Sequence, residues 1–330
     1  MLEHGGRLRA AARHYGIAEA DWLDLSSGIA PWPWPLPSIP QRAWARLPET
    51  DDGLEQAAQG FYGAAQVLPV AGSQAAIQLL PRLRPAAAVG VLSPCYAEHA
   101  RAWRQAGHQV HELPESQVEA WLERLQVLVL VNPNNPTGRR LPPEQLLDWH
   151  ARLANRGGWL VVDEAFMDST PAFSLAGHSQ LPGLIVLRSF GKFFGLAGLR
   201  LGFVLAEAPL LRRLAAQLGP WTLSGPARWV GQVCLRDLPG HQVQAARAAA
   251  ASHRLGALLA QHGLAPDGGC DLFQWCTSAR AEALQVFLAR RGILLRLFNH
   301  PPSLRFGLPP DEAGWQRLEQ GLHAFTEALP

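Results

Sequence analysis

The pattern of hydrophobic and polar positions predicts alternating strands and helices through the middle of this 330-residue chain. Short apolar runs rich in β-branched residues are typical of strands buried on both faces of a parallel sheet. Residues 143–155 show helical spacing, with a proline in the first turn and two glycines after the end. Such alternation favours a parallel or mixed sheet covered by helices. The predicted strands are residues 66–70, 88–92, 127–131, 159–163, 184–188 and 201–205.

The pattern changes after Pro226, where an Ala- and Arg-rich helical region extends to about His262. A final helix from Asp311 places four apolar residues on one face at helical spacing, which indicates a face packed on a core. We interpret this region as a second, smaller α/β domain. Between the two long helical stretches we expect a strand at 271–276, a helix at 281–291 and a strand at 293–297.

The N-terminal segment is rich in proline and tryptophan, with the run Ala-Pro-Trp-Pro-Trp-Pro-Leu-Pro at residues 30–37. Prolines at this density exclude a helix and a central strand, so we expect an extended arm. Its tryptophans favour burial, which predicts that the arm docks on the body of the protein or on a second subunit. The predicted division is an arm at 1–48, a large domain at 49–225 and a small domain at 226–330.

The composition is that of a globular protein with a large core, with 48% hydrophobic and 17% charged residues. A net charge of +2 from scattered basic residues indicates no nucleic-acid surface and no polybasic membrane patch. The four cysteines match neither a metal motif nor a redox motif and are typical of a reducing compartment. No apolar run suits a signal peptide or a membrane span. We therefore expect a cytoplasmic protein without a metal site.

The basic residues comprise 28 arginines and a single lysine, Lys192. An amine that must lose its proton and condense with an aldehyde cannot be replaced by guanidinium, which stays charged at any accessible pH. A lone lysine could also remain by chance on a solvated face. The residues around Lys192 therefore decide between these two interpretations.

Three segments with candidate chemistry follow predicted strands. They are Asn132-Pro133-Asn134-Asn135-Pro136-Thr137-Gly138, the strand end Val161-Val162-Asp163-Glu164, and the run from Ser189 to Arg200 that contains Lys192. In a doubly wound sheet the carboxyl ends of the strands form the ligand crevice, so we expect the three segments to converge there.

In this order and spacing the segments resemble the fold type I enzymes that depend on pyridoxal 5′-phosphate (PLP), in the class I/II aminotransferase superfamily. The resemblance implies a large domain with a mostly parallel seven-stranded sheet between helices, and a smaller α/β C-terminal domain. It implies that Lys192 holds PLP as a Schiff base and that Asp163 pairs with the pyridine nitrogen, which keeps the ring an electron sink. Asn135 would donate a hydrogen bond to the phenolic oxygen of the cofactor.

The cofactor phosphate needs hydrogen-bond donors. Ser73 and Gln74 open a predicted helix, where backbone amides and the helix dipole favour an anion. Ser189 can add a hydroxyl and Arg200 a charge-assisted hydrogen bond. Tyr96 matches the aromatic residue that stacks on the cofactor ring, although a tyrosine of the core would fit the same pattern.

The chain departs from the usual pattern of the superfamily at three positions. A tyrosine that would give the phenolic oxygen a second hydrogen bond is replaced by Phe166. The usual Arg-Tyr-Pro, whose tyrosine reaches the phosphate of the partner subunit, is Arg46-Leu47-Pro48. The hydroxyl residue often found before the lysine is Gly191. The cofactor is therefore expected to have fewer contacts than usual.

PLP chemistry leaves transamination, decarboxylation, racemisation and elimination open, and groups that orient the substrate select among them. Arg305 matches the arginine that binds the α-carboxylate in a bidentate way. The N-terminal segments His4-Gly5-Gly6 and Leu25-Ser26-Ser27-Gly28 resemble the L-threonine-O-3-phosphate decarboxylase family of cobalamin (vitamin B12) biosynthesis. The resemblance implies conversion of L-threonine O-3-phosphate to (R)-1-amino-2-propanol O-2-phosphate and CO2. His4 and Arg296 are candidates for the substrate phosphate, and Gly28 and Asn135 for further substrate contacts.

Two other functions stay open on the sequence. Histidinol-phosphate aminotransferase is a close relative with a phosphorylated amino substrate, but it normally has tyrosines in place of Leu47 and Phe166. A PLP-binding regulatory module without turnover usually carries a DNA-binding domain, and no basic helix-turn-helix precedes this region. We expect a homodimer, because active sites of this superfamily draw residues from two subunits.

Overall fold

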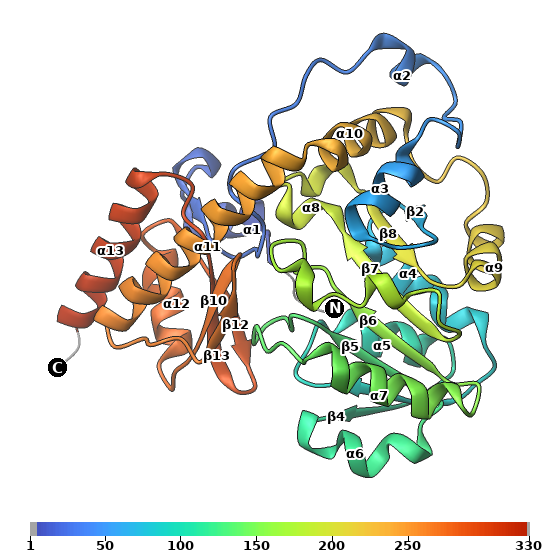
Figure 1. Ribbon diagram of the computed structural model, residues 1–330. Coiled ribbons are helices and arrows are strands. Elements are labelled where there is room, and N and C mark those ends of the chain that lie inside the picture. The colour runs from blue at the N-terminus through green and yellow to red at the C-terminus, as the bar shows by residue number, and fades with distance from the viewer. Residues whose placement is uncertain (1–4, 329–330) are drawn as a thin grey trace. The chain divides into compact units, whose positions relative to one another are not determined.

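A computed structural model describes residues 5–328 of the chain (Figure 1). The described residues form two compact units. Unit 1 comprises residues 5–32, 136–138 and 245–328, and unit 2 comprises residues 33–135 and 139–244. The division into an arm, a large domain and a small domain with the boundaries given above stays a prediction.

Unit 2 is built on a seven-stranded sheet in the order β2-β8-β7-β6-β5-β3-β4. β8 runs antiparallel to both of its neighbours, and the other strand pairs are parallel, as predicted for a mostly parallel sheet. The strands are β2 (Leu68–Val70), β3 (Ala88–Leu92), β4 (Gln109–Leu113), β5 (Val127–Val131), β6 (Trp159–Asp163), β7 (Leu184–Ser189) and β8 (Gly202–Leu205).

Helices cover both faces of this sheet. Residues of α4, α5 and α9 pack on one face around the buried valines of β3, β5 and β6, and α7 packs against β6 on the other face (Figure 1). The helices of unit 2 are α2 (Gln41–Ala45), α3 (Leu54–Tyr62), α4 (Ser73–Leu79), α5 (Glu98–Gln105), α6 (Val118–Trp121), α7 (Pro143–Ala154), α8 (Phe190–Phe193), α9 (Ala208–Leu218), α10 (Gly225–Arg236) and the first turns of α11 (Leu238–Gln261).

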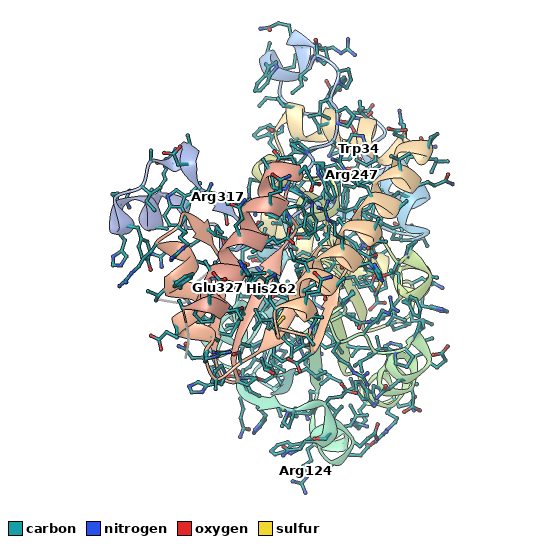
Figure 2. All side chains as sticks on the ribbon, turned by 90° about the vertical axis from the view of Figure 1, so that its left-hand side faces the viewer. Trp34, Arg124, Arg247, His262, Arg317 and Glu327 are labelled. Carbon is teal, nitrogen blue, oxygen red and sulfur yellow. The ribbon has the colours of Figure 1, made fainter. Side chains whose placement is uncertain are left out.

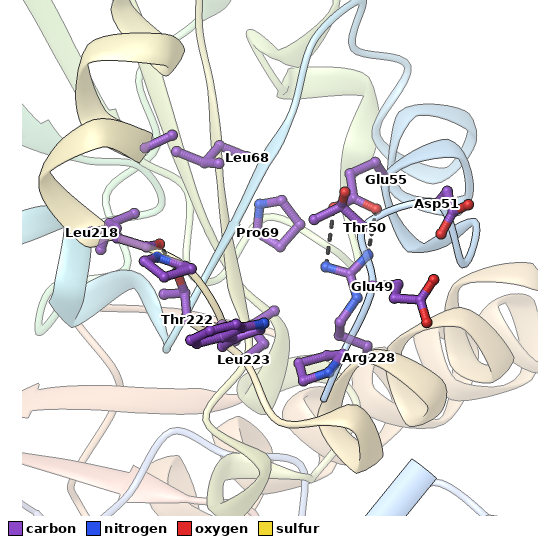
Figure 3. Close-up of a pocket in the computed structure, with 15 residues that line it drawn as sticks. Glu49, Thr50, Asp51, Glu55, Leu68, Pro69, Leu218, Thr222, Leu223 and Arg228 are labelled. Carbon is purple, nitrogen blue, oxygen red and sulfur yellow. Dashed lines mark hydrogen bonds and ion pairs between the residues drawn. The ribbon is translucent and has the colours of Figure 1, made fainter. Parts of the chain in front are cut away.

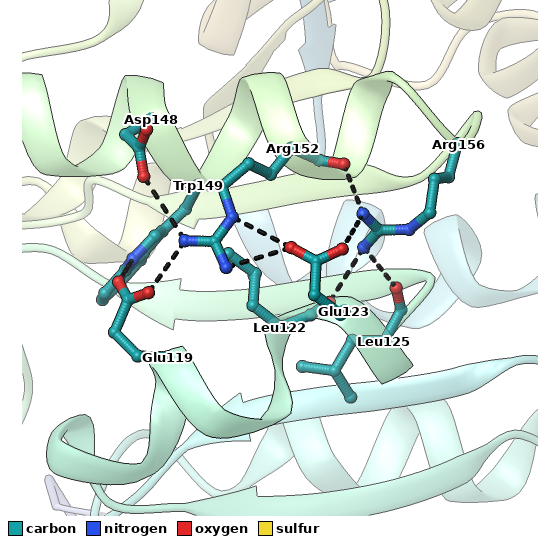
Figure 4. A network of polar contacts seen from close by, with 8 residues as sticks. All are labelled: Glu119, Leu122, Glu123, Leu125, Asp148, Trp149, Arg152 and Arg156. Atoms are coloured by element: carbon teal, nitrogen blue, oxygen red, sulfur yellow. Dashed lines mark hydrogen bonds and ion pairs between the residues drawn. The ribbon is translucent and has the colours of Figure 1, made fainter.

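A surface network of ion pairs joins α7 to α6 and to the 3₁₀ turn that follows α6 (Figure 4). Arg152 contacts Glu119 at 2.8 Å and Glu123 at 3.0 Å, and Arg156 contacts Glu123 at 2.7 Å. Such exposed pairs contribute about 0.2–1 kcal/mol each. The network therefore holds the two segments together without defining the core.

Unit 1 contains the four-stranded sheet β12-β13-β10-β9, in which all pairs are antiparallel, and a parallel pair of β1 with β11. Its strands are β1 (Leu23–Asp24), β9 (Gly268–Cys270), β10 (Phe273–Thr277), β11 (Ile293–Leu294), β12 (Arg296–Asn299) and β13 (Pro302–Gly307). Its helices are α1 (Leu8–Tyr15), α12 (Ala281–Ala289), α13 (Glu312–Glu327) and the remainder of α11. The single strand predicted at 293–297 is thus two short strands in different sheets.

Short 3₁₀ helices connect several of these elements. They are η1 (Glu19–Asp21), η2 (Leu80–Leu83), η3 (Glu115–Gln117), η4 (Leu122–Arg124), η5 (Pro171–Phe173), η6 (Ala176–His178) and η7 (Ala197–Leu199).

Trp34 and Trp32 of the N-terminal arm dock on the protein, whereas Trp44 is 63% exposed. Trp34 is 5% exposed in unit 2, and its ring centroid lies 4.9 Å from that of Phe194 (Figure 2). In unit 1, Trp32 donates a hydrogen bond from Nε1 to Pro310 O at 2.7 Å, and Arg247 lies 3.8 Å above its ring. Burial of Trp34 fixes the proline-rich residues 31–40, which have no regular secondary structure. The prediction of an extended arm over residues 1–48 is wrong on either side of this stretch, where α1, β1 and α2 form.

Within residues 5–328, no helix is long and apolar enough to cross a membrane. In the same described range, no group of three or more histidine, cysteine or acidic side chains is placed to hold a metal ion. The four cysteines are free thiols.

Candidate active site

The carboxyl ends of β5, β6 and β7 bring the three sequence motifs of unit 2 to one edge of the sheet. Asp163 is the last residue of β6 and Ser189 the last of β7, and Lys192 follows in α8. The backbone of the asparagine-rich segment is tied to this edge, because Asn132 N donates to Asp163 O at 2.9 Å. Parallel strands necessarily end together, which is why distant segments meet here.

Asp163 is a buried carboxylate, 3% exposed, with two donors near its oxygens. His99 Nε2 lies 2.9 Å from Oδ2, and the backbone N–H of Ala165 donates to Oδ1 at 3.1 Å. His99 is itself 1% exposed. A buried charge requires such partners, since transfer of a lone carboxylate from water is costly.

His99 was not among the residues selected from the sequence. It lies in the first turn of α5, three residues after Tyr96, and the two rings meet edge to face with centroids 6.1 Å apart. Its position three residues after Tyr96, in the turn that leads into α5, is the signal that could have identified it, since His99 N donates to Tyr96 O at 3.1 Å there.

Lys192 lies close to the aromatic residue that departs from the superfamily pattern. Its Nζ is 5.6 Å from the ring centroid of Phe166, which is 5% exposed. The structure also gives a reason for the glycine before the lysine. A Cβ at Gly191 would lie 2.6 Å from the Cα of Ala197, so the loop after α8 leaves no space for a side chain.

Three polar side chains gather around Gly72 at the start of α4. Ser73 Oγ and Ser189 Oγ lie 3.0 Å apart, and a Cβ at Gly72, whose φ is +73°, would collide with the guanidinium of Arg200. Arg200 has a left-handed backbone, with φ of 56°, and donates from Nη1 to Ala197 O at 3.1 Å. Two hydroxyls and a guanidinium beside a glycine fit a phosphate group, which accepts charge-assisted hydrogen bonds.

Tyr96 is placed by a hydrogen bond rather than by apolar packing alone. Its hydroxyl donates to Gln74 Oε1 at 3.1 Å. Burial raises the pKa of Tyr96 to about 12, with the negative charges of Glu98 and Asp163 adding to the effect, so the phenol stays protonated at neutral pH. The side chain of Gln74 is thus engaged with Tyr96, and its predicted contribution to the phosphate site would come from its backbone amide.

In unit 1, two of the predicted substrate residues are cross-strand neighbours. Arg296 of β12 stands opposite Arg305 of β13 in the antiparallel register, so both side chains share one face of the sheet. Arg305 is 6% exposed and donates from Nη2 to Ser26 O at 2.8 Å. Burial, together with the positive charge of Arg296, lowers the pKa of Arg305 to about 10.

The segment that resembles the decarboxylase family lies against the same strand. Gly307 N donates to Leu25 O at 2.8 Å, and Gly6 N donates to Ser26 Oγ at 2.8 Å. Gly28, three residues further along, is buried. His4 lies outside the described residues.

A surface pocket of about 510 Å³ lies elsewhere in unit 2 (Figure 3). Arg228 at its edge joins α10 to α3, because its guanidinium contacts Asp52 at 2.6 Å and Glu55 at 2.7 Å. The pocket is lined by Pro48, Glu49, Thr50, Asp51, Glu55, Leu68, Pro69, Ala215, Leu218, Gly219, Pro220, Trp221, Thr222, Leu223 and Arg228. These residues include none of the predicted cofactor contacts within the described chain.

Comparisons with known proteins give the family and the fold of this chain. The family model described as aminotransferase class I and II matches residues 39–312. A threonine-phosphate decarboxylase from Pseudomonas aeruginosa is 65% identical over 99% of both chains, and one from a Sinorhizobium species is 46% identical over 97% of both. The fold matches the crystal structure of histidinol-phosphate aminotransferase from Sinorhizobium meliloti in complex with PLP, with a TM-score of 0.86 and 21% identity, over 100% of this chain and 96% of that one. The chain belongs to the aminotransferase class I and II family.

Proposed function

We propose that this chain is a PLP-dependent decarboxylase that converts L-threonine O-3-phosphate to (R)-1-amino-2-propanol O-2-phosphate and CO2 in cobalamin biosynthesis. The observation that carries the proposal is the 65% identity, over 99% of both chains, to a protein named threonine-phosphate decarboxylase. The arrangement of Lys192, Asp163 and the phosphate-compatible cluster in unit 2 supports it.

The residues of unit 2 are suited to hold PLP. Lys192 supplies the amine that would attach it, and Asp163, supported by His99, would face the pyridine nitrogen. Asn135 would face the phenolic oxygen and Tyr96 the ring. Bound PLP supplies an electron sink for the electron pair left at Cα when CO2 departs. The phosphate would be bound by Ser73, Gln74, Ser189 and Arg200.

Lys192 would also move a proton. Once displaced from the cofactor by the substrate amine, the Nζ of Lys192 would take up the proton that the substrate ammonium gives up. The resulting ammonium would deliver this proton to Cα after CO2 has left, so that no further general acid would be needed. The ring of Phe166, whose centroid lies 5.6 Å from Nζ, would shield one side of this amine from water.

The paired arginines of unit 1 suit a substrate that carries two anionic groups. Arg305 would bind the α-carboxylate and Arg296 the phosphate, with Gly28 and His4 as further substrate contacts. Because Arg296 and Arg305 repel each other at neighbouring positions, an anion between them would be stabilised by both. A substrate with a carboxylate and a phosphate satisfies both guanidinium groups.

An assay without a keto acid separates decarboxylation from transamination. Purified PLP-loaded protein, incubated with L-threonine O-3-phosphate, is expected to release CO2. The Lys192→Arg variant is expected to release none, because a guanidinium cannot condense with the aldehyde. Release is measured as trapped CO2 alongside the amino alcohol phosphate. Absence of CO2, together with amino transfer from histidinol phosphate to 2-oxoglutarate, would contradict the proposed reaction in favour of the aminotransferase.

Replacement of His99 tests the proposed role of Asp163. His99→Phe removes a buried donor from the carboxylate, which costs about 1–3 kcal/mol in folding free energy and is expected to weaken PLP binding. His150→Phe is the matched control, because His150 is also buried and bonds Pro182 O at 3.0 Å on a helix away from the site. Titration of each apoprotein variant with PLP measures its affinity for the cofactor. Equal PLP affinities of the two variants would count against the assignment of Asp163.

We also propose a homodimer in the cytoplasm. Large apolar side chains are exposed on unit 2, among them Trp44 at 63%, Leu47 at 65% and Trp221 at 60%. Trp221 lines the pocket of Figure 3, and Leu47 precedes Pro48, which lines it too. Exposed aromatic residues beside a pocket are typical of protein interfaces, and a second copy of the chain is the occupant that the family resemblance implies.

The proposed dimer predicts that a charge introduced at residue 221 weakens the association of the two subunits. Trp221→Glu is expected to shift the protein towards a monomer, because a carboxylate would be buried without a partner in the interface. Analytical ultracentrifugation over a dilution series measures the mass of both proteins. A native chain that sediments as a monomer at all concentrations, with full activity, would contradict the dimer.

A further inference from the structure

A cluster of buried charged side chains lies in unit 2, outside the residues considered so far. Arg188 is 1% exposed and Glu164 is 0% exposed. Arg188 donates from Nη1 to Glu164 Oε2 at 2.5 Å and from Nη2 to Asp168 Oδ1. The ring of Tyr62 lies beside the guanidinium, 4.6 Å from its Cζ to the ring centroid. One guanidinium therefore joins two carboxylates of the loop after β6 and an aromatic ring at the end of α3.

The Arg188–Glu164 pair lies directly behind the proposed cofactor contacts. The register of β6 and β7 aligns Asp163 with Leu187, and Glu164 N donates to Leu187 O at 2.9 Å, so Glu164 and Arg188 are neighbours one position further along. Successive side chains of a strand point to opposite faces. Glu164 and Arg188 consequently point away from the face to which Asp163 and Ser189 point. Their ion pair ties together the two strand ends that present those residues.

The same cluster holds the loop after β6. Ser174 donates to Glu164 Oε2 at 2.5 Å and accepts from Arg188 Nη1 at 3.1 Å, and Leu175 N donates to Glu164 Oε1 at 2.7 Å. Arg188 thus contacts Glu164, Asp168 and Ser174, which span the first half of the segment between β6 and β7. The loop is therefore fixed from the interior of the unit.

The fixed loop carries a residue that lies beside the reactive amine. Phe166 lies between Glu164 and Asp168 in the sequence, and its ring centroid is 5.6 Å from Lys192 Nζ. A shift of the loop would therefore change the surroundings of Lys192 as well as the position of Asp163. A misplacement of about 1 Å at a reacting centre can lower the rate on the order of a hundredfold.

Stability alone does not account for this cluster. Burial raises the pKa of Glu164 and Asp168, and the positive charge of Arg188 acts in the opposite direction. The free energy lost by removing such groups from water largely offsets their mutual attraction. What distinguishes the cluster is its place at the strand ends.

We propose that Arg188 is a positioning residue for PLP, which acts through Glu164 and Asp168 on the strand ends that present Asp163 and Ser189. The proposal rests on the proposed cofactor role of Asp163. It implies that loss of the contacts of Arg188 with Glu164 and Asp168 displaces Asp163, Ser189 and Phe166 and thereby lowers the affinity for PLP. Arg188 itself would make no contact with the cofactor.

The test is a titration of apoprotein variants with PLP, followed by the visible spectrum of each loaded variant against pH. Arg188→Gln is expected to lower PLP affinity on the order of tenfold, as is typical for groups that orient direct ligand contacts, and to shift the pH at which the spectrum changes. Arg188→Lys is expected to give an intermediate affinity, because an ammonium keeps the charge but lacks the planar fork that reaches both carboxylates.

The chain offers a matched control in Arg228. It is 5% exposed and pairs with two carboxylates, Asp52 and Glu55, between α3 and α10. Arg228→Gln therefore breaks a comparable cluster in the same unit, and its thermal midpoint of unfolding is expected to fall by a similar amount. Its PLP affinity is expected to stay within about twofold of the native value, because Arg228 does not border the strand ends.

Two outcomes would overturn the proposal. Equal PLP affinities of Arg188→Gln and Arg228→Gln would show that the cluster has a structural role alone. If Arg188→Gln does not fold, Asp168→Asn decides, since it keeps the shape of the side chain: an unchanged affinity and spectrum rejects the positioning role. Asp163→Asn in the same titration separates the proposals, because an unchanged affinity there would reject the cofactor site itself.

Discussion

The candidate site depends on a carboxylate that is held in the interior of a protein at the end of a parallel strand. Burying Asp163 without partners would cost more free energy than a small protein can tolerate, since net stabilities are only about 5–15 kcal/mol. His99 and the backbone N–H of Ala165 provide partners on the protein side. A protonated pyridine nitrogen facing the same carboxylate would offset the remaining free-energy cost of burying Asp163. In return, the carboxylate would keep that nitrogen protonated.

The division of work between lysine and arginine follows from the same reasoning. Arginine serves wherever a permanent cation is needed, as at Arg188 and Arg228 in buried clusters and at Arg305 beside Ser26. Condensation with an aldehyde needs an amine that can lose its proton, and the sequence contains one such side chain, Lys192. The reactive amine is thus a lysine, whereas the buried ion pairs are made by arginines.

Much of the sheet could be predicted because buried parallel strands have a distinctive sequence. Residues 88–92 and 127–131 are apolar runs, as is 159–163 up to its final Asp163, and the structure has strands with the same bounds. β4 was missed because Gln109–Leu113 lies at the edge of the sheet and alternates with polar residues. The strand predicted at 293–297 divides into β11 and β12, because its first residues pair with β1 and its later ones with β13, which no local pattern reveals.

The site was predicted in the same uneven way. Motifs led to the selection of Lys192 and Asp163, which stay predictions. His99 and Arg188 are found only from contacts with residues distant in the sequence, at separations of 64 residues for His99 and 24 for Arg188. The central claim concerns Lys192, and its most direct test is reduction of the PLP-loaded protein with borohydride, followed by peptide mass mapping. The account predicts a single modified peptide, with the pyridoxyl group on Lys192. A modification elsewhere or none at all, or a Lys192→Ala variant that keeps both the visible absorbance and the turnover, would contradict it.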